Sequence, residues 1–472
     1  MRARQARLAR LRQDDATVLD RLYGTAYEDV RFPAPREFGD VEAADVLRFT
    51  LGLARALFDA GARTRDIQTA VIAVTATWGM QYLEVGIGGR SVQLQYAPPG
   101  RRPTVAFLAL GSEDTRDLDR LAALQRLTTR IAATRMGCDE AAPALRRLTS
   151  GGSRWPWWFG LAGGALLAAM LCLLASGTVR AACVSPLVFL VAERASWTLG
   201  RSGLPSFYVT TLRTACVMAA VITLIDAGAL SGPEGASVVA ANVILMLPIL
   251  SVVSLTEDAI DGFPSMAAVR AVGLAAFVAA LVSGILITGF LLRGADTDAR
   301  HTSLTALPVV LTLVTSCIGS LGNTVFMGGG PRLVPWGMAT GLLGATVKVA
   351  GTSTLHWSTP LATGLATAAM GTVAAAAAPR TGIPARAVVI PGIAGGVLPG
   401  PDLYRGMLQL LLGVPGAGGY LLTTVTAVAA IGVGTVLGTI VGAGAERQWW
   451  RYRHTASGGA GVRGVPDGSG RG

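Results

Sequence analysis

Between residues 155 and 445 the chain carries few charged side chains, and its apolar residues run in stretches long enough to cross a lipid bilayer. About 20 residues of helix span the roughly 30 Å hydrocarbon core. Such stretches lie near residues 156–176, 179–199, 207–230, 236–255, 267–292, 304–327, 333–352, 360–379, 386–411 and 420–443. The count is nine rather than ten if the segment 386–411 is re-entrant. The predicted fold is therefore an α-helical polytopic membrane protein with about ten transmembrane helices.

Residues 1–154 differ from this region because they are rich in Arg, Asp and Glu. We expect a flexible basic tail over residues 1–40 and a cytoplasmic α/β domain over residues 41–138. Apolar residues at helical spacing predict helices that begin near Val46 and Leu118, and Thr64 is suited to cap another helix between them. Runs of strand-forming residues separated by turns predict strands over 82–87, 91–96 and 104–110.

The remaining boundaries follow from the same shifts in composition. We predict a linker over residues 139–154, a first transmembrane half over residues 155–300, a second half over residues 301–445 and a basic cytoplasmic tail over residues 446–472. The first 40 residues contain no apolar run typical of a signal peptide, so internal helices are expected to direct insertion.

The formal net charge of the chain is +11, and almost all of its cations are arginines. Nucleic-acid binding is one interpretation of such basicity. Basic segments that flank membrane helices on the cytoplasmic side explain the charge better. We therefore expect a plasma-membrane protein in contact with the lipid bilayer, with both termini in the cytoplasm and no nucleic-acid partner.

Five cysteines and three histidines are spread along the chain without disulfide or metal-ligand spacing. The predicted cytoplasmic domain contains no histidine. We therefore predict no metal, no cofactor and no enzymatic activity.

Two apolar segments contain residues that interrupt helices. The stronger one, IPGIAGGVLPGPDLY at residues 390–404, is expected to be broken at Pro391, Gly392, Pro399 and Gly400. Its weaker counterpart, LPILSVVSLTEDAIDG, opens at Pro248. Broken backbone survives in a bilayer only where it is buried in protein or lines a cavity.

Each broken segment falls in the fourth span of a five-span half. An odd number of spans gives the two halves opposite orientations. We therefore predict two inverted repeats whose broken helices meet at a shared midplane site, as in many secondary transporters. Chance similarity between two proline-containing helices is the alternative.

The chain resembles the threonine/serine exporter family over about residues 42–445. The segments LRFTLGLARALFDAGARTRDIQTAVIAVTATWGM, VFMGGGPRLVPWGMATGLLGATVKVAGT and VVIPGIAGGVLPGPDLYRGM carry the resemblance. The first-half segment departs from the family pattern because Ile249 follows Pro248 where the family has glycine. The resemblance implies a secondary active transporter, an antiporter that exports L-threonine, L-serine and similar small amino acids. It also implies that the proton motive force drives export, with protons as the coupling ion.

A zwitterionic substrate needs a cation or a helix N-terminus for its carboxylate, and carboxylates or free carbonyl groups for its ammonium group. Lys348, the single lysine, lies in the seventh span and either binds the carboxylate or a proton partner, or extends to the outer interface. Asp402 and Tyr404 follow the second Pro-Gly pair and are predicted to face a cavity.

Further candidates lie in the first half. Glu257, Asp258 and Asp261 either exchange protons or form a solvated cytoplasmic loop. Asn242 either binds the substrate hydroxyl or joins neighbouring helices.

Other functions stay open at this point. A small-solute channel, or a solute-sensing membrane receptor gated by the N-terminal domain, is the alternative to the exporter. A membrane-embedded enzyme finds no nucleophile–His–acid set to support it. The oligomeric state is also open, with a homo-oligomer as one alternative.

Overall fold

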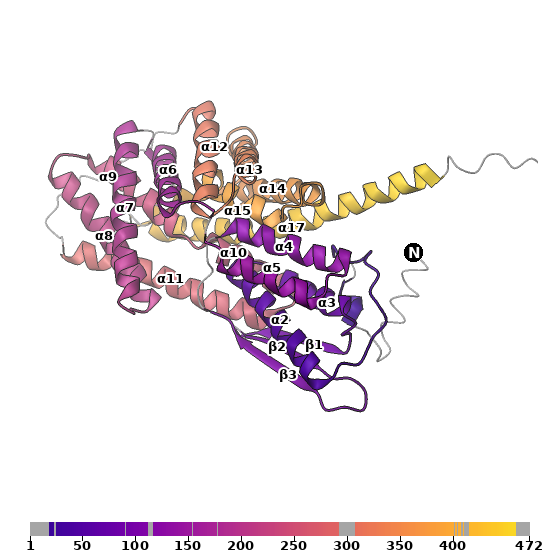
Figure 1. Cartoon of the computed structure of the whole chain (residues 1–472). Helices are drawn as coiled ribbons and strands as arrows, with labels where there is room; N and C mark the ends of the chain where they lie inside the picture. Colours follow the sequence, from indigo (N-terminus) through magenta and orange to yellow (C-terminus); the bar gives the residue numbers. More distant parts are fainter. Residues whose placement is uncertain are drawn as a thin grey trace, which may run out of the picture.

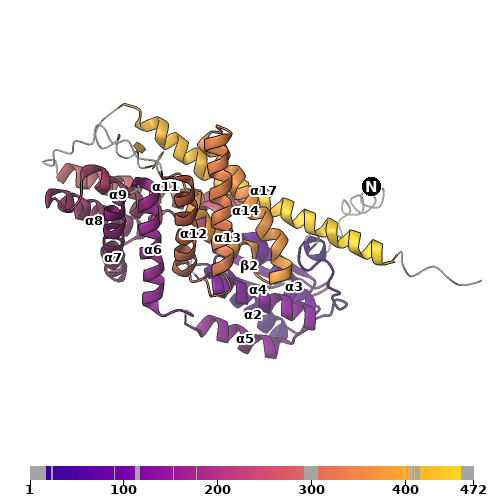
Figure 2. The ribbon, with the colours of Figure 1, turned by 90° about the horizontal axis from the view of Figure 1, so that it is seen from above.

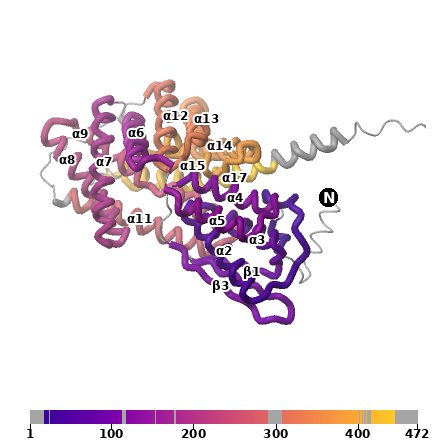
Figure 3. Tube along the Cα trace, viewed as in Figure 1, coloured from indigo at the N-terminus to yellow at the C-terminus, as the bar shows by residue number. Residues whose placement is uncertain are grey.

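The computed structural model describes residues 18–22, 25–89, 91–111, 117–152, 154–176, 178–291, 307–400, 402–403, 405–406, 409 and 415–458. The N-terminal domain, in indigo and purple, lies against one side of a body of long helices (Figure 1). Figure 3 shows helix α4 of that domain between the sheet and α15 of the helical body.

The N-terminal domain has a three-stranded antiparallel sheet in the order β1-β2-β3, with helices packed on it. Its elements are η1 (Val18–Leu22), α2 (Asp40–Asp59), α3 (Thr64–Thr77), β1 (Leu83–Gly88), β2 (Ser91–Tyr96), β3 (Thr104–Ala109), α4 (Leu118–Thr134) and α5 (Cys138–Ser150). The strands predicted from the sequence are confirmed to within one residue at each end. The buried residues of β2 alternate along the strand, at Val92, Leu94 and Tyr96, so one face of the sheet forms the core beneath α2.

Three local expectations differ from the structure. Thr64 is the first residue of α3 rather than its cap, because Arg63 holds the extended cap position. Helix α5 occupies the segment predicted as a linker. Part of the predicted tail also packs on the domain, since Tyr27 is buried and donates a hydrogen bond to Thr128 Oγ1 at 3.0 Å. The charged composition of this segment predicted a flexible tail, and it did not indicate that Tyr27 would be buried in the core.

The helical body contains the apolar helices, long and short. They are α6 (Trp157–Ser176), α7 (Val179–Arg201), α8 (Ser206–Asp226), α9 (Gly232–Met246), α10 (Ile249–Asp261), α11 (Pro264–Leu291), α12 (Val309–Phe326), α13 (Val334–Val349), the π-helical η3 (Ala350–Thr354), α14 (Thr359–Thr381), α15 (Ala385–Gly396) and α17 (Ala417–Gly458). Among the described residues, 7 helices are long and apolar enough to cross a membrane, or up to 8 if the bent pair α9–α10 is one span. The chain is therefore a multi-pass membrane protein.

The expectation of ten spans is met only in part. Each of the ten apolar stretches contains a helix, but α13 has 16 residues and α15 has 12, and both are shorter than a full span. Helix α13 continues directly into η3, and α15 ends at a break. Hydropathy alone could not separate a short buried helix from a spanning one, because both are apolar.

Small residues let these helices approach closely. Helices α6, α12, α13 and α14 stand in a row (Figure 2), and α14 packs along α17. A Cβ atom added to Gly438 of α17 would collide with the carbonyl oxygen of Ala368 in α14. The same atom added to Gly163 of α6 would lie 2.6 Å from the carbonyl oxygen of Gly322 in α12. Close backbone contact of this kind is typical of membrane helix packing.

Candidate functional site

Two breaks interrupt helices inside the body. Helices α9 and α10 meet at Pro248 with a bend of 46°. Helix α15 ends at Gly396, and residues 397–399 form the second break. The prediction that Pro391 and Gly392 interrupt the helix is wrong, because α15 runs through both residues.

Polar side chains from neighbouring helices bind the backbone of α15 around Pro391. Asn323 Nδ2 of α12 donates a hydrogen bond to the Pro391 carbonyl at 3.0 Å. Thr340 Oγ1 of α13 donates one to the Val388 carbonyl, also at 3.0 Å. These donors satisfy carbonyl groups near the position where proline removes a donor from the helix ladder.

The structure brings the two broken segments into contact. A Cβ atom on Gly400, just after the second break, would lie 2.5 Å from Ile244 Cδ1, just before the first. Arg386, near the start of α15, reaches the Leu250 carbonyl and the side chains of Ser254 and Glu257 in α10. Helices α10 and α15 are therefore neighbours. Helix α10 begins just after the first break, and α15 ends just before the second.

Lys348 of α13 binds the second break. Its Nζ atom donates to the carbonyl oxygens of Val397 at 2.9 Å and Leu398 at 3.1 Å. Asp402, just beyond Gly400, is half-buried and interacts electrostatically with this ammonium group. The side chain thus points to the break rather than to the end of its helix. Tyr404 lies outside the described residues.

The carboxylates of α10 do not form a solvated loop. Glu257 and Asp258 are 3% and 2% exposed, and Arg386 is 6% exposed. The Glu257 carboxylate pairs with the Arg386 guanidinium, and its other oxygen lies 3.9 Å from Arg63 Nε of the N-terminal domain. The loop interpretation is therefore wrong for both residues, because α10 turns its acidic face inward.

Two more arginines complete this charge network. Arg270 Nε of α11 lies 2.9 Å from Asp258 Oδ2, and Arg65 of α3 lies 3.1 Å from Asp261 Oδ1. Arg63 also pairs with Asp66 at 3.0 Å, and the charge of Asp66, followed by that of Glu257, raises the pKa of the Arg63 guanidinium above its usual value. The network therefore joins the N-terminal domain to α10, α11 and α15.

These arginines were not predicted as site residues. Arg386 is buried in the first turn of α15. The signal that could have found it is its position one turn before a Pro-Gly pair in an apolar segment. Intramembrane charges are rare and are usually paired.

Asn242 serves helix packing in this structure. Its Nδ2 donates to Ser185 Oγ of α7 at 3.2 Å and to the Val238 carbonyl at 2.9 Å. Ser185 Oγ in turn donates to the Ala168 carbonyl of α6 at 3.1 Å. This chain of hydrogen bonds joins three helices. Among the described residues no group of three or more His, Cys, Asp or Glu side chains is placed to hold a metal ion.

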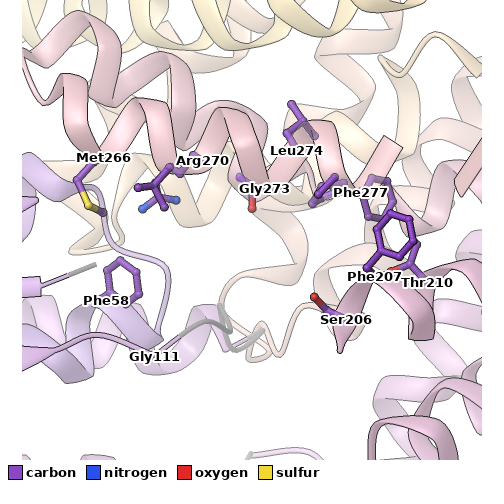
Figure 4. Close-up of a pocket in the computed structure, with 14 residues that line it drawn as sticks. Phe58, Gly111, Ser206, Phe207, Thr210, Met266, Arg270, Gly273, Leu274 and Phe277 are labelled. Atoms are coloured by element: carbon purple, nitrogen blue, oxygen red, sulfur yellow. The ribbon is translucent and has the colours of Figure 1, made fainter. Parts of the chain in front are cut away.

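A cavity of about 350 Å³ lies beside the first break, between α8, α11 and the N-terminal domain (Figure 4). Pro248 and Ser251 of the break form part of its wall. Phe58, Met266 and Arg270 lie toward one end of it, and Phe207 and Phe277 toward the other. The cavity thus connects the domain junction with one of the two broken segments.

Known proteins resemble the chain in sequence. A family model described as "Putative threonine/serine exporter" matches residues 48–292, which include most of the N-terminal domain and helices α6 to α11. The "Probable threonine/serine exporter" of Mycobacterium tuberculosis (strain ATCC 25618 / H37Rv) is 25% identical over 416 residues, which cover 84% of this chain and 77% of that protein. No solved structure matches the chain.

Proposed function

The chain belongs to the threonine/serine exporter family, and we propose that it exports L-threonine, L-serine and similar small amino acids, driven by the proton motive force. Membership in an exporter family points to a transporter rather than an enzyme. The proposal includes two five-helix halves of opposite orientation and both termini in the cytoplasm.

The close approach of Gly400, just after the second break, to Ile244, one turn before the first, is the observation that carries this proposal. At Pro248 the chain presents the N-terminal end of α10, which no side chain caps. At residues 397–399 it presents the C-terminal end of α15, with carbonyl groups held by Lys348. A helix N-terminus favours a carboxylate, and free carbonyl groups favour an ammonium group. The two helix ends therefore offer the two kinds of partner that a zwitterion needs.

Lys348 and Asp402 are the proposed binding residues at the second break. Lys348 can give up a hydrogen bond to a backbone carbonyl and donate one to the substrate carboxylate instead, because an ammonium group has three donors that rotate freely. The Asp402 carboxylate can then accept a hydrogen bond from the substrate ammonium group. Pro399 and Gly400 hold the open backbone, and Pro391 and Gly392 belong to the helix that leads to it.

The α10 carboxylates are the proposed proton-coupling groups. Glu257 and Asp258 are buried beside arginines, and Asp261 lies one turn further along the helix. Uptake of a proton by one of them would release its arginine partner. Loss of such an ion pair would change how α10 packs against α15 and α11.

Whole-cell efflux of labelled threonine tests the proposal. Cells loaded with threonine should lose it faster when they contain the protein, and an uncoupler should abolish the difference. Counterflow in proteoliposomes separates an exporter from a channel, because only the exporter accelerates labelled threonine flux when unlabelled threonine is on the opposite side. If neither the uncoupler nor unlabelled threonine on the opposite side changes the rate of threonine flux, the proposal is rejected in favour of a channel.

A further inference from the structure

The cavity beside Pro248 extends from the domain junction into the membrane region. Along α11 its wall runs from Met266 to Phe277, which is about 17 Å at 1.5 Å per residue. Phe58 and Gly111 of the N-terminal domain line the opposite side. This length is about half the thickness of a ~30 Å hydrocarbon core.

An apolar cluster closes the cavity at its far end. Met218, Val243, Leu281 and Ile285 form this cluster, and each is at most 8% exposed. Phe277, at the end of the cavity wall, packs against it, and so does Leu403, which follows the second break. Phe277 therefore links the far end of the cavity wall to a cluster that also contacts the segment after the second break.

The chemistry of the wall suits a small neutral zwitterion. Among the described residues that line the cavity, Arg270 is the one with a charged side chain, and Asp258 lies 2.9 Å from it as its ion-pair partner. Hydroxyl groups come from Ser206, Thr210 and Ser251. The described part of the wall carries no net charge and gives little attraction to an anionic lipid headgroup. Its hydroxyl groups and paired guanidinium can bind a hydroxy amino acid.

We propose that this cavity is the cytoplasmic vestibule through which a small hydroxy amino acid reaches the two breaks, with the N-terminal domain forming one side of its mouth. The inference rests on the proposed export function. It gives the N-terminal domain a direct part in substrate entry, and it makes this structure the state that is open to the cytoplasmic side.

Gly273 of α11 offers a precise probe of the vestibule. It lines the cavity, and a Cβ atom added there meets nothing within 4 Å, so a cysteine fits without disturbing the packing. The neighbouring Val272 is 70% exposed and is not part of the cavity wall, and it serves as the matched position.

The experiment uses the full chain with Gly273→Cys or Val272→Cys in inside-out membrane vesicles, with the unsubstituted chain as background. Uptake of labelled threonine is measured before and after a membrane-impermeant, negatively charged thiol reagent is added. We expect the reagent to abolish most of the uptake by Gly273→Cys, and unlabelled threonine to slow this reaction. Uptake by Val272→Cys and by the unsubstituted chain should persist.

Three outcomes would count against the vestibule. If the cysteine of Gly273→Cys does not react with the thiol reagent, lipid fills the cavity. If it reacts and threonine uptake is unchanged, the cavity lies outside the transport pathway. A reaction rate that threonine leaves unchanged also overturns the proposal. Absence of threonine uptake by the unsubstituted chain would instead refute the export function itself, so the two failures are distinguishable.

Discussion

Lys348 is the residue whose environment most directly concerns transport. It donates hydrogen bonds to two carbonyl groups at the end of α15, from a helix that is separate in sequence. Hydrogen bonds to charged groups contribute about 1.5–3 kcal/mol each. A side chain with such partners both stabilises the break and is able to change partner when a carboxylate arrives.

We expect Lys348→Met to lower threonine efflux by about tenfold or more, since loss of one charge-assisted hydrogen bond to substrate costs at least about 1.4 kcal/mol. The measurement is whole-cell efflux normalised to the amount of folded protein in the membrane. Thr346→Met is the matched control, because Thr346 is exposed on the same helix and its hydroxyl donates only to the Leu342 carbonyl. Normal efflux by Lys348→Met would remove Lys348 from the binding site.

The buried pair of Arg386 and Glu257 gives a second prediction at the residue scale. Removing one partner of a buried pair leaves an uncompensated charge and costs about 3–5 kcal/mol. We expect Arg386→Met to lower the thermal unfolding temperature in detergent, and Arg386→Met with Glu257→Leu to recover much of the loss. Exposed Arg332, changed to Met, is the control. A double variant no more stable than Arg386→Met would contradict a direct pairing.

At the scale of elements, the packing of α14 on α17 depends on glycines one turn apart. A Cβ atom at Gly434, Gly438 or Gly442 would enter the space of backbone carbonyl groups in α14. The backbone of α17 thus lies directly on that of α14. A side chain added at one of these glycines would meet backbone atoms, which cannot rotate away as a side chain can.

Gly438→Leu should therefore force α14 and α17 apart and destabilise the protein, since overpacking a tight interface costs about 1–3 kcal/mol or more. Thermal unfolding of the full chain in detergent measures the effect. Gly444→Leu on the same helix is the control, because a Cβ atom there meets nothing within 4 Å. Equal stability of the two variants would show that the helices are not packed through this face.

At the scale of the whole molecule, the N-terminal domain contacts the helical body at α10 and at the end of α12. Gly61, with φ of +81°, approaches so closely that a Cβ atom would lie 2.8 Å from Leu250 of α10. At the other side the Leu118 amide of α4 donates to the Met327 carbonyl after α12, at 3.1 Å. A domain held at two places on the helical body is suited to respond when α10 and α12 move relative to one another.

The exposed edge of this junction can be tested by charge reversal. Arg65→Glu would oppose Asp261 with a like charge, and we expect faster hydrogen exchange of α3 and α10 backbone amides in the full chain. Arg65→Glu with Asp261→Arg should restore the slower exchange. Arg48→Glu is the control, since Arg48 pairs with Asp45 inside α2. Exchange that Arg65→Glu leaves unchanged would mean that this pair does not hold the domain.

Local sequence patterns predicted the elements well and their partners poorly. The strands of the N-terminal domain and the positions of the apolar helices follow from periodicity and from the need to satisfy backbone groups in a bilayer. The prediction of a break at Pro391 was wrong, and the side chains that bind the backbone around it, Asn323 and Thr340, come from other helices. The α10 carboxylates looked like a loop because their arginine partners lie far away in sequence.

The sequence by itself therefore determined that this chain is a multi-pass membrane protein with an N-terminal α/β domain, and it identified the family through its motifs. Only the tertiary structure decided which charges meet. Arg386 and Glu257 are 129 residues apart, and Arg65 and Asp261 are 196 apart. The free-energy cost of exposing apolar side chains to water, or unpaired backbone groups to lipid, depends on the local sequence. The pairing of a buried charge depends instead on how helices from separate parts of the chain pack together.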